Sequence, residues 1–220
     1  MRETELLVPA SSLEVLKVAV IYGADAVYIG GEVYGLRAKA KNFSKEDMIE
    51  GIKFAHDHGV KVYVTANILA HNGDLEGVKE YFKELKEIKP DALIIADPAV
   101  FMLAKEICPE IERHVSTQAN NTNYGTYKFW YDLGATRVVS ARELSLAEIK
   151  RLIADDGLIV TDNVLQDGDI IESRYAITRR NRTIHKRMRD YLYELTHDEG
   201  FTTTILPLGD GVSISVKGKK

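Results

Sequence analysis

The sequence predicts an α/β protein that begins as a partial (βα) barrel of about six βα units and continues with a strand, a helix and an antiparallel hairpin. Three observations support this fold class. Short apolar runs of strand length recur along the chain, helical patterns lie between them, and the last segments alternate with a period of two. The 220 residues, of which 45% are hydrophobic, are enough to form a substantial core.

The strands are predicted from short apolar runs. Such runs are typical of parallel sheets, whose strands are buried on both faces. A more polar run at 114–117 continues the same rhythm and is the weakest of the set. The other runs lie at 6–8, 26–29, 62–64, 92–95 and 138–139.

The helices are predicted from capping boxes, in which a serine accepts from a free backbone N–H and an acid three residues later reaches back. Glycines stand where these helices are expected to end, since glycine adopts the left-handed C′ conformation at little cost. The boxes are Ser11 with Glu14, Ser44 with Asp47, and Ser145 with Glu148, and the glycines are Gly23, Gly59 and Gly134.

Six such units follow one another up to about residue 141 without a linker, which favours part of a (βα) barrel. A doubly wound sheet is the alternative. It would be supported by a nucleotide-binding glycine loop, and the sequence contains neither G-x-G-x-x-G nor G-x-x-x-x-G-K-[ST].

The pattern changes after Ile153. A buried strand is predicted at 158–161, then a helix with Ile184, Met188, Tyr191 and Leu195 on one face, then a hairpin of 201–206 and 212–216. We therefore expect two segments, 1–150 and 151–220, that share one sheet, with 158–161 adding beside 138–139. An open edge of that sheet predicts homo-oligomers.

Composition excludes several classes of protein. No apolar run approaches the roughly 20 residues of a membrane span, so a cytoplasmic protein without a membrane partner is expected. A single cysteine, Cys108, excludes an intrachain disulfide and a multi-thiolate zinc site. The formal net charge of −4 argues against nonspecific binding of nucleic acid by the whole chain.

Residues 4–150 resemble the peptidase U32 family, the collagenase-like proteases. The resemblance lies in 5–10, 23–31, 36–38, 42–43, 64–67, 96–98, 116–121 and 140–145. It implies a TIM-like barrel and one of two activities, peptide hydrolysis or hydroxylation of the wobble uridine of tRNA with a prephenate-derived donor. The family's cysteine-containing segments, H-G-A-M-C and G-x-C, are missing, so an incomplete and inactive enzyme is expected.

Residues 155–217 resemble the C-terminal part of class I, metal- and S-adenosylmethionine-dependent O-methyltransferases of the caffeoyl-CoA and tRNA 5-hydroxyuridine type, notably at 157–165 and 206–212. The resemblance implies a Rossmann-like tail in which Asp162 and Asn163 bind Mg²⁺, with Asp97 as a candidate third ligand. An unaccompanied Asp-Asn pair is alternatively a turn. The family's S-adenosylmethionine loop is missing, so binding of that cofactor is not expected.

Two further functions of the whole chain stay open. The first is a noncatalytic fusion, natural or designed, and the second is a methyltransferase remnant that acts on tRNA.

Polar residues follow the predicted strands of the first segment, where the active-site loops of a (βα) barrel converge. Arg37 is the candidate for holding an anionic donor or a phosphate. Each of these residues is alternatively a helix cap or turn former. The candidate catalytic residues are Arg37, Asn67, Asp97, Gln118 and Asn121.

A basic stretch in the second segment predicts contacts with tRNA phosphates, with steep salt dependence as its mark. The alternative is a solvated helix face whose cations pair with Asp190, Glu194 and Asp198. The candidate residues are Arg179, Arg180, Arg182, Lys186 and Arg187.

Overall fold

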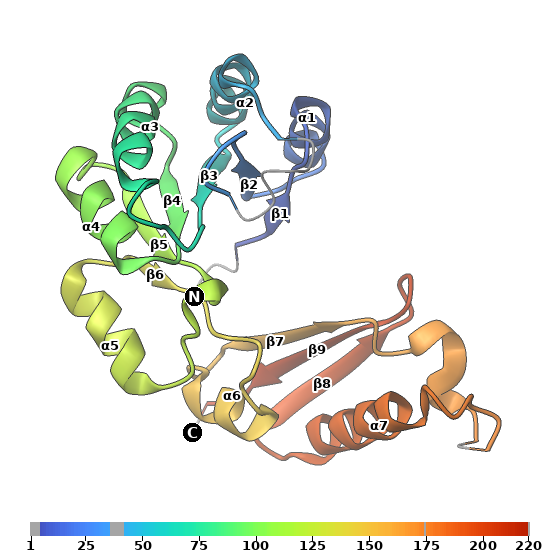
Figure 1. Cartoon of the computed structure of the whole chain (residues 1–220). Coiled ribbons are helices and arrows are strands. Elements are labelled where there is room, and N and C mark those ends of the chain that lie inside the picture. The colour runs from blue at the N-terminus through green and yellow to red at the C-terminus, as the bar shows by residue number, and fades with distance from the viewer. Residues whose placement is uncertain (1–4, 36–41, 174, 220) are drawn as a thin grey trace. The chain divides into compact units, whose positions relative to one another are not determined.

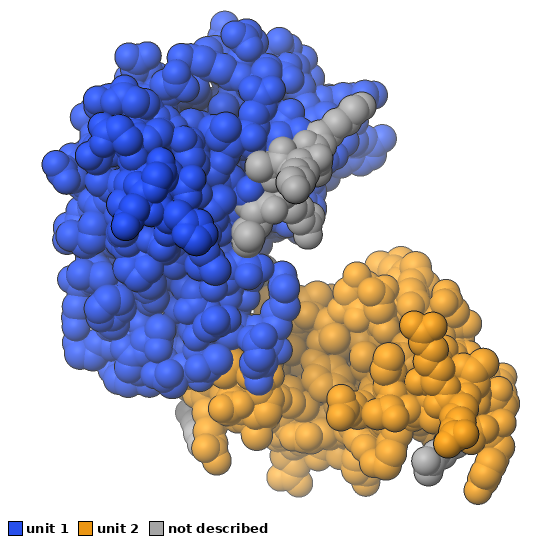
Figure 2. All heavy atoms as spheres, viewed as in Figure 1, with its two compact units in different colours: residues 1, 3–143 blue, residues 2, 144–220 orange. Residues whose placement is uncertain are grey.

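The structure is a computed structural model that describes residues 5–35, 42–173 and 175–219 (Figure 1). The chain divides into two compact units, called unit 1 and unit 2 below (Figure 2). Unit 1 extends to Glu143, and unit 2 begins at Leu144.

Unit 1 contains a six-stranded sheet in which every pair of neighbours is parallel. Its order is β1-β2-β3-β4-β5-β6, without the reversal that defines a doubly wound sheet, and the sheet curls into a half-barrel. The prediction of six parallel strands is confirmed. The strands are β1 (Leu7–Pro9), β2 (Ala26–Gly30), β3 (Lys61–Ala66), β4 (Ala92–Ile95), β5 (Glu112–Val115) and β6 (Arg137–Val138).

The helices of unit 1 bury the larger of its two apolar clusters against the sheet. Leu16, Phe82 and Phe101 are fully buried in this layer, and Figure 1 shows α1 to α4 along the outer face of the sheet. The helices are α1 (Leu13–Ile21), α2 (Lys45–Asp57), α3 (Leu75–Ile88), α4 (Pro98–Ile107) and α5 (Tyr124–Leu133). A smaller cluster around Ala26, Tyr63 and Ala92 is separate from this core.

The predicted helix starts are confirmed with one correction. Ser145 and Glu148 form a complete capping box, and the Ser44 hydroxyl accepts from the backbone N–H of Asp47. At the first helix the cap is Ser12 and not Ser11, because Ser12 is the extended residue whose hydroxyl accepts from Val15 N–H. The three predicted glycines all have positive φ angles, as predicted for helix ends.

Unit 2 contains a three-stranded antiparallel sheet of order β7-β9-β8 with α7 packed against it (Figure 1). The predicted hairpin is confirmed, because β8 and β9 pair from Phe201 with Lys217 to Leu206 with Val212. The elements are α6 (Leu146–Leu152), β7 (Leu158–Asp162), the 3₁₀ segment η2 (Gln166–Ile171), α7 (Arg182–His197), β8 (Phe201–Leu206) and β9 (Val212–Lys217).

The expectation that both segments share one sheet is wrong. β7 pairs antiparallel with β9 from Leu158 with Val216 to Asp162 with Val212, and it belongs to a second sheet. The physical reason is the supply of backbone partners. β6 has only two residues, whereas β9 is long enough to offer a register partner to every residue of β7.

The predicted apolar face of α7 also needs a correction. Ile184 is 57% exposed, and the neighbouring His185 is buried instead. The buried residues of the helix are His185, Leu192 and Leu195. His185 lies two helical turns before Leu192, and Leu195 lies one turn after it, so all three are on one face of the helix. Within the described ranges, the structure contains no helix with the length and apolar character needed to span a membrane.

Candidate functional site

The predicted catalytic residues that the structure describes follow strands of one parallel sheet. Asn67 follows β3, Asp97 follows β4, and Gln118 and Asn121 follow β5. Because neighbouring parallel strands end at the same edge, all four lie at the carboxyl edge of the half-barrel, where a (βα) barrel binds its substrates. Arg37 lies outside the described residues.

Asp97 caps a helix. Its carboxylate accepts hydrogen bonds from the backbone N–H groups of Ala99 at 2.8 Å and Val100 at 3.1 Å, in the first turn of α4. These contacts satisfy two donors that the helix itself leaves unpaired. The side chain therefore has a structural role, and its catalytic role stays a prediction.

Asn121 is fully buried and joins three parts of unit 1. Its amide nitrogen donates to the carbonyl oxygens of Ser116 at 3.2 Å and Val139 at 2.9 Å. Its amide oxygen accepts from the indole N–H of Trp130 at 3.0 Å. This side chain holds the loop after β5 in place. Gln118, in the 3₁₀ turn of that loop, is exposed and accessible to a ligand.

A second polar group lies near the opposite, amino-terminal ends of the strands, and sequence reasoning missed it. Glu5, just before β1, accepts from the two terminal guanidinium nitrogens of Arg137 on β6, at 2.6 and 3.1 Å. The hydroxyl of Tyr63 on β3 donates to the same carboxylate at 2.8 Å. The His114 ring packs edge-on against Tyr63, with ring centroids 4.7 Å apart.

These contacts shift the proton affinities of the group. Hydrogen bonds from Arg137 hold the pKa of Glu5 below its ordinary value, against a smaller opposing effect of burial. Burial and the bond to Glu5 raise the pKa of Tyr63. Burial, followed by the nearby charge of Arg137, lowers the pKa of His114 although Glu112 lies 3.3 Å from its ring. At neutral pH the group therefore contains a carboxylate, a neutral phenol and a neutral imidazole.

A sequence signal for this group exists. Tyr63 and His114 are polar or aromatic residues inside predicted strands whose neighbours Val62, Val64 and Val115 are apolar and buried. Alternation with a period of two places such residues on the face opposite the apolar core. The partner Glu5, 132 positions before Arg137, is not predictable from that alternation because it lies outside the strands.

The basic stretch of unit 2 begins just before α7 and continues into the second turn of that helix. Arg179, Arg180 and Arg187 are exposed and make no ion pair with any other residue that the structure describes. Arg182 is half-buried and donates to the carbonyl oxygen of Ile177, while Lys186 pairs with Asp190 at 2.7 Å.

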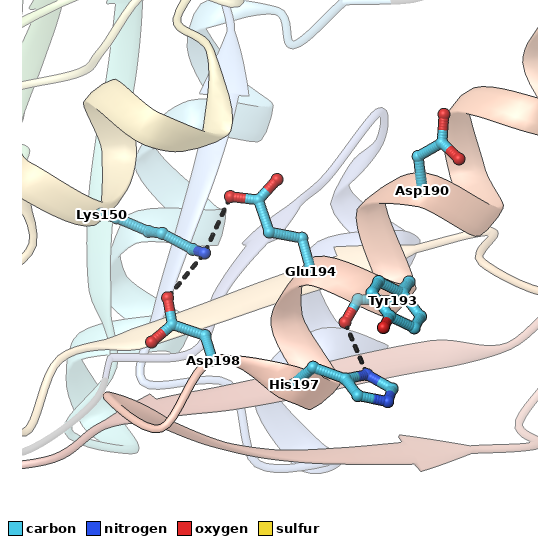
Figure 3. A pocket seen from close by; sticks show the side chains of 6 residues that line it. All are labelled: Lys150, Asp190, Tyr193, Glu194, His197 and Asp198. Carbon is cyan, nitrogen blue, oxygen red and sulfur yellow. Dashed lines mark hydrogen bonds and ion pairs between the residues drawn. The ribbon is translucent and has the colours of Figure 1, made fainter.

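The acids that were expected to neutralise this stretch are mostly engaged elsewhere. Glu194 and Asp198 both pair with Lys150 on α6, at 2.9 and 2.7 Å. Figure 3 shows these contacts in an open pocket of about 550 Å³, with Asp190 set apart from them. Lys186 is therefore paired with an acid, as the alternative of a charge-paired helix face predicts. The exposed arginines are not paired in this way with any acid that the structure describes.

The predicted metal pair, Asp162 and Asn163, is exposed at the end of β7. The backbone N–H of Asn163 donates to the Asp162 carboxylate at 2.8 Å, and Asn163 has a φ of 57°. Asn is one of the few residues that tolerate this left-handed conformation, so the pair has a local backbone role. The described residues contain no group of three or more histidines, cysteines or acids arranged to hold a metal ion, so Mg²⁺ binding stays a prediction.

Comparison with known proteins agrees with the half-barrel. The model of peptidase family U32 matches residues 11–162, which include β7 of unit 2. The tRNA hydroxylation protein P1 of Bacillus subtilis (strain 168) is 46% identical over 151 residues, covering 69% of this chain and 36% of P1. The tRNA hydroxylation protein P2 of the same organism is 33% identical over 226 residues, covering 94% of this chain and 72% of P2.

Among solved structures, the U32 peptidase Mk0906 is similar with a TM-score of 0.54 at 13% identity, over 84% of this chain and 86% of that one. The fold thus defines a (βα)-barrel type of protein. The chain belongs to the peptidase U32 family. It spans about a third of the length of P1.

Proposed function

We propose that this chain serves RNA hydroxylation, with tRNA as its substrate. The observation that carries the proposal is its 46% identity to a relative named as a tRNA hydroxylation protein. In this proposal the carboxyl edge of the half-barrel, with Asn67 and Gln118, faces the target nucleotide. The exposed arginines of unit 2 contact the phosphate backbone.

The position of these arginines supports a role in binding. α7 has no acidic residue in its first turn, and its N-cap residue Asn181 makes no side-chain capping bond. Cations at the amino end of a helix oppose the helix dipole and destabilise it. The same end attracts phosphate, so the arginines and the helix dipole favour the same ligand.

Peptide hydrolysis is the less favoured function of the family for this chain. Cys108 is the only cysteine of the sequence, and it is fully buried. Burial raises the pKa of its thiol to about 11. A cysteine peptidase needs an accessible thiolate, which Cys108 does not provide. A noncatalytic fusion and a methyltransferase remnant are not favoured, because P2 is similar across 94% of this chain.

Binding of tRNA is measured by fluorescence anisotropy at several salt concentrations. We expect the triple variant Arg179→Ala, Arg180→Ala, Arg187→Ala to lose roughly tenfold or more in affinity, and the slope of log K against log salt to fall by about three. The matched control removes three lysines of unit 1 that are already paired with Glu76, Glu80 and Asp132. The control variant is Lys79→Ala, Lys83→Ala, Lys128→Ala.

Equal losses of affinity in both triple variants would show that only total charge matters and would contradict a phosphate site at Arg179, Arg180 and Arg187. Hydroxylation itself is tested by mass spectrometry of tRNA from a bacterium that lacks its own hydroxylation proteins and expresses this chain. Absence of 5-hydroxyuridine there, with tRNA binding intact, would refute the catalytic part of the proposal.

Self-association through a sheet edge stays a prediction. The apparent mass of the chain in size-exclusion chromatography tests it.

A further inference from the structure

The hydrogen-bond ladders of unit 1 leave its two outer strands weakly held. Among the described residues, β1 has three residues and pairs only with β2, while β6 has two residues and pairs only with β5. β6 is held by two register pairs, His114 with Arg137 and Val115 with Val138. Strands this short contribute little stability of their own.

One side-chain contact connects the two ends of this sheet. The Glu5 carboxylate accepts two hydrogen bonds from the Arg137 guanidinium and a third from Tyr63. Because Glu5 leads into β1, Arg137 begins β6 and Tyr63 lies on β3, the contact joins the first, middle and last strands of the sheet.

The surroundings make this ion pair stronger than a surface pair. The side chains of Arg137 and Glu5 are 38% and 25% exposed, and the guanidinium lies 5.3 Å from the centroid of the Tyr63 ring. Partial removal from water and two-pronged geometry both strengthen a charge-assisted hydrogen bond. Lys61 also acts on Glu5, and the neighbouring His114 interacts with both members of the pair and with Glu112.

We infer that Glu5, Arg137 and Tyr63 form a clasp that holds the half-barrel curled by tying β1 to β6 through β3. The outer strands of this sheet have few backbone hydrogen bonds. In the clasp, three side chains supply the hydrogen bonds that hold these strands in place. Its loss releases β1 and β6 while the central strands β2 to β4, with their longer ladders and buried core, stay folded.

The test is hydrogen exchange of the full chain, followed by mass spectrometry of peptides that cover β1, β6 and β3. We expect Glu5→Gln to raise exchange at β1 and β6 roughly tenfold, as is usual when a charge-assisted bond is lost, and to leave β3 unchanged. The charge-swapped variant Glu5→Arg, Arg137→Glu should restore part of the protection. Glu50→Gln breaks the exposed 2.6 Å pair with Lys17 and is the matched control, with no expected effect.

Two outcomes would overturn the clasp. Exchange at β1 and β6 that is the same in Glu5→Gln as in Glu50→Gln would show that the contact holds nothing. A uniform rise across all strands would show general destabilisation and no local release. Tyr63→Phe removes only one of the three bonds, so it provides a milder variant that stays folded if Glu5→Gln does not, with a smaller rise expected at the same two strands.

Discussion

The indole N–H of Trp130 donates a 3.0 Å hydrogen bond to the side-chain oxygen of Asn121, and both side chains are buried. Trp130 is the only tryptophan of the sequence, and it lies in unit 1. Its fluorescence therefore reports the unfolding of unit 1 separately from unit 2.

Asn121→Ala is expected to lower the free energy of unfolding of unit 1 by about 3 kcal/mol. The substitution leaves the buried Trp130 N–H without its partner and removes one hydrogen bond each from the carbonyl oxygens of Ser116 and Val139. Urea denaturation followed by Trp130 fluorescence measures the loss. Gln118→Ala, in the same loop but exposed, serves as the control and should change the free energy by less than about 0.5 kcal/mol. A loss of tRNA hydroxylation in Asn121→Ala without any loss of stability would contradict the structural role.

Asp97→Ala is expected to cost about 1 kcal/mol of stability, because it removes the cap of α4. Asp97→Asn retains an oxygen that accepts from the same backbone N–H groups, so its stability should stay near that of the unchanged protein. The same urea experiment compares the two variants. Equal destabilisation by both substitutions would show that the negative charge of the carboxylate, and not its capping hydrogen bonds, stabilises α4.

Acid is expected to destabilise unit 1 in two steps. The pKa of His114 is lowered in the folded chain, so the unfolded chain binds the proton more tightly and stability falls as the pH drops below about 6.5. The pKa of Glu5 is also lowered, so its contribution is present above about 4.5 and is lost as the pH falls through its folded value. Urea midpoints of Trp130 fluorescence from pH 8 down to about 3 check this order.

The variant that separates these two steps is His114→Gln, which should remove the upper step and retain the lower one. Glu5→Gln should do the reverse. An unchanged pH profile in both variants would mean that other groups control the acid response.

Lys150→Met is expected to destabilise unit 2 by about 1 kcal/mol. Lys150 is 15% exposed and pairs with both Glu194 and Asp198, and its hydrogen bond lowers the pKa of Asp198. Hydrogen exchange in peptides from α6 and α7 measures the effect. Lys186→Met breaks an exposed pair with Asp190 and should have no measurable effect, so similar exchange in the two variants would contradict the prediction.

The predictions from sequence were most accurate where the information is local. Ser145 and Glu148 lie three residues apart, and a capping box depends on nothing beyond that separation. The strands of unit 1 follow from their apolar runs for the same reason. The misplaced cap at Ser11 shows the limit of this reasoning, since two adjacent serines differ only in which one adopts the extended conformation.

Pairing between distant segments needed the tertiary structure. β7 was expected beside β6, and its apolar residues suit either neighbour equally well. The choice of β9 depends on which edge is long enough to pair with it. In the same way, Asp97 and Asn121 were recognised as polar residues after strands, but their capping and bridging contacts depend on atoms that the alternation of residues does not specify.

The sequence by itself determined the six βα units, the closing hairpin and the family, because periodicity, caps and motifs are properties of neighbouring residues. Only the tertiary structure showed that unit 2 has a sheet of its own, that Arg179, Arg180 and Arg187 form no ion pair within the described residues, and that Glu5 meets Arg137. The reason is physical: contacts between residues far apart in the chain are selected by the shape and pairing capacity of the folded surfaces, which no single segment contains.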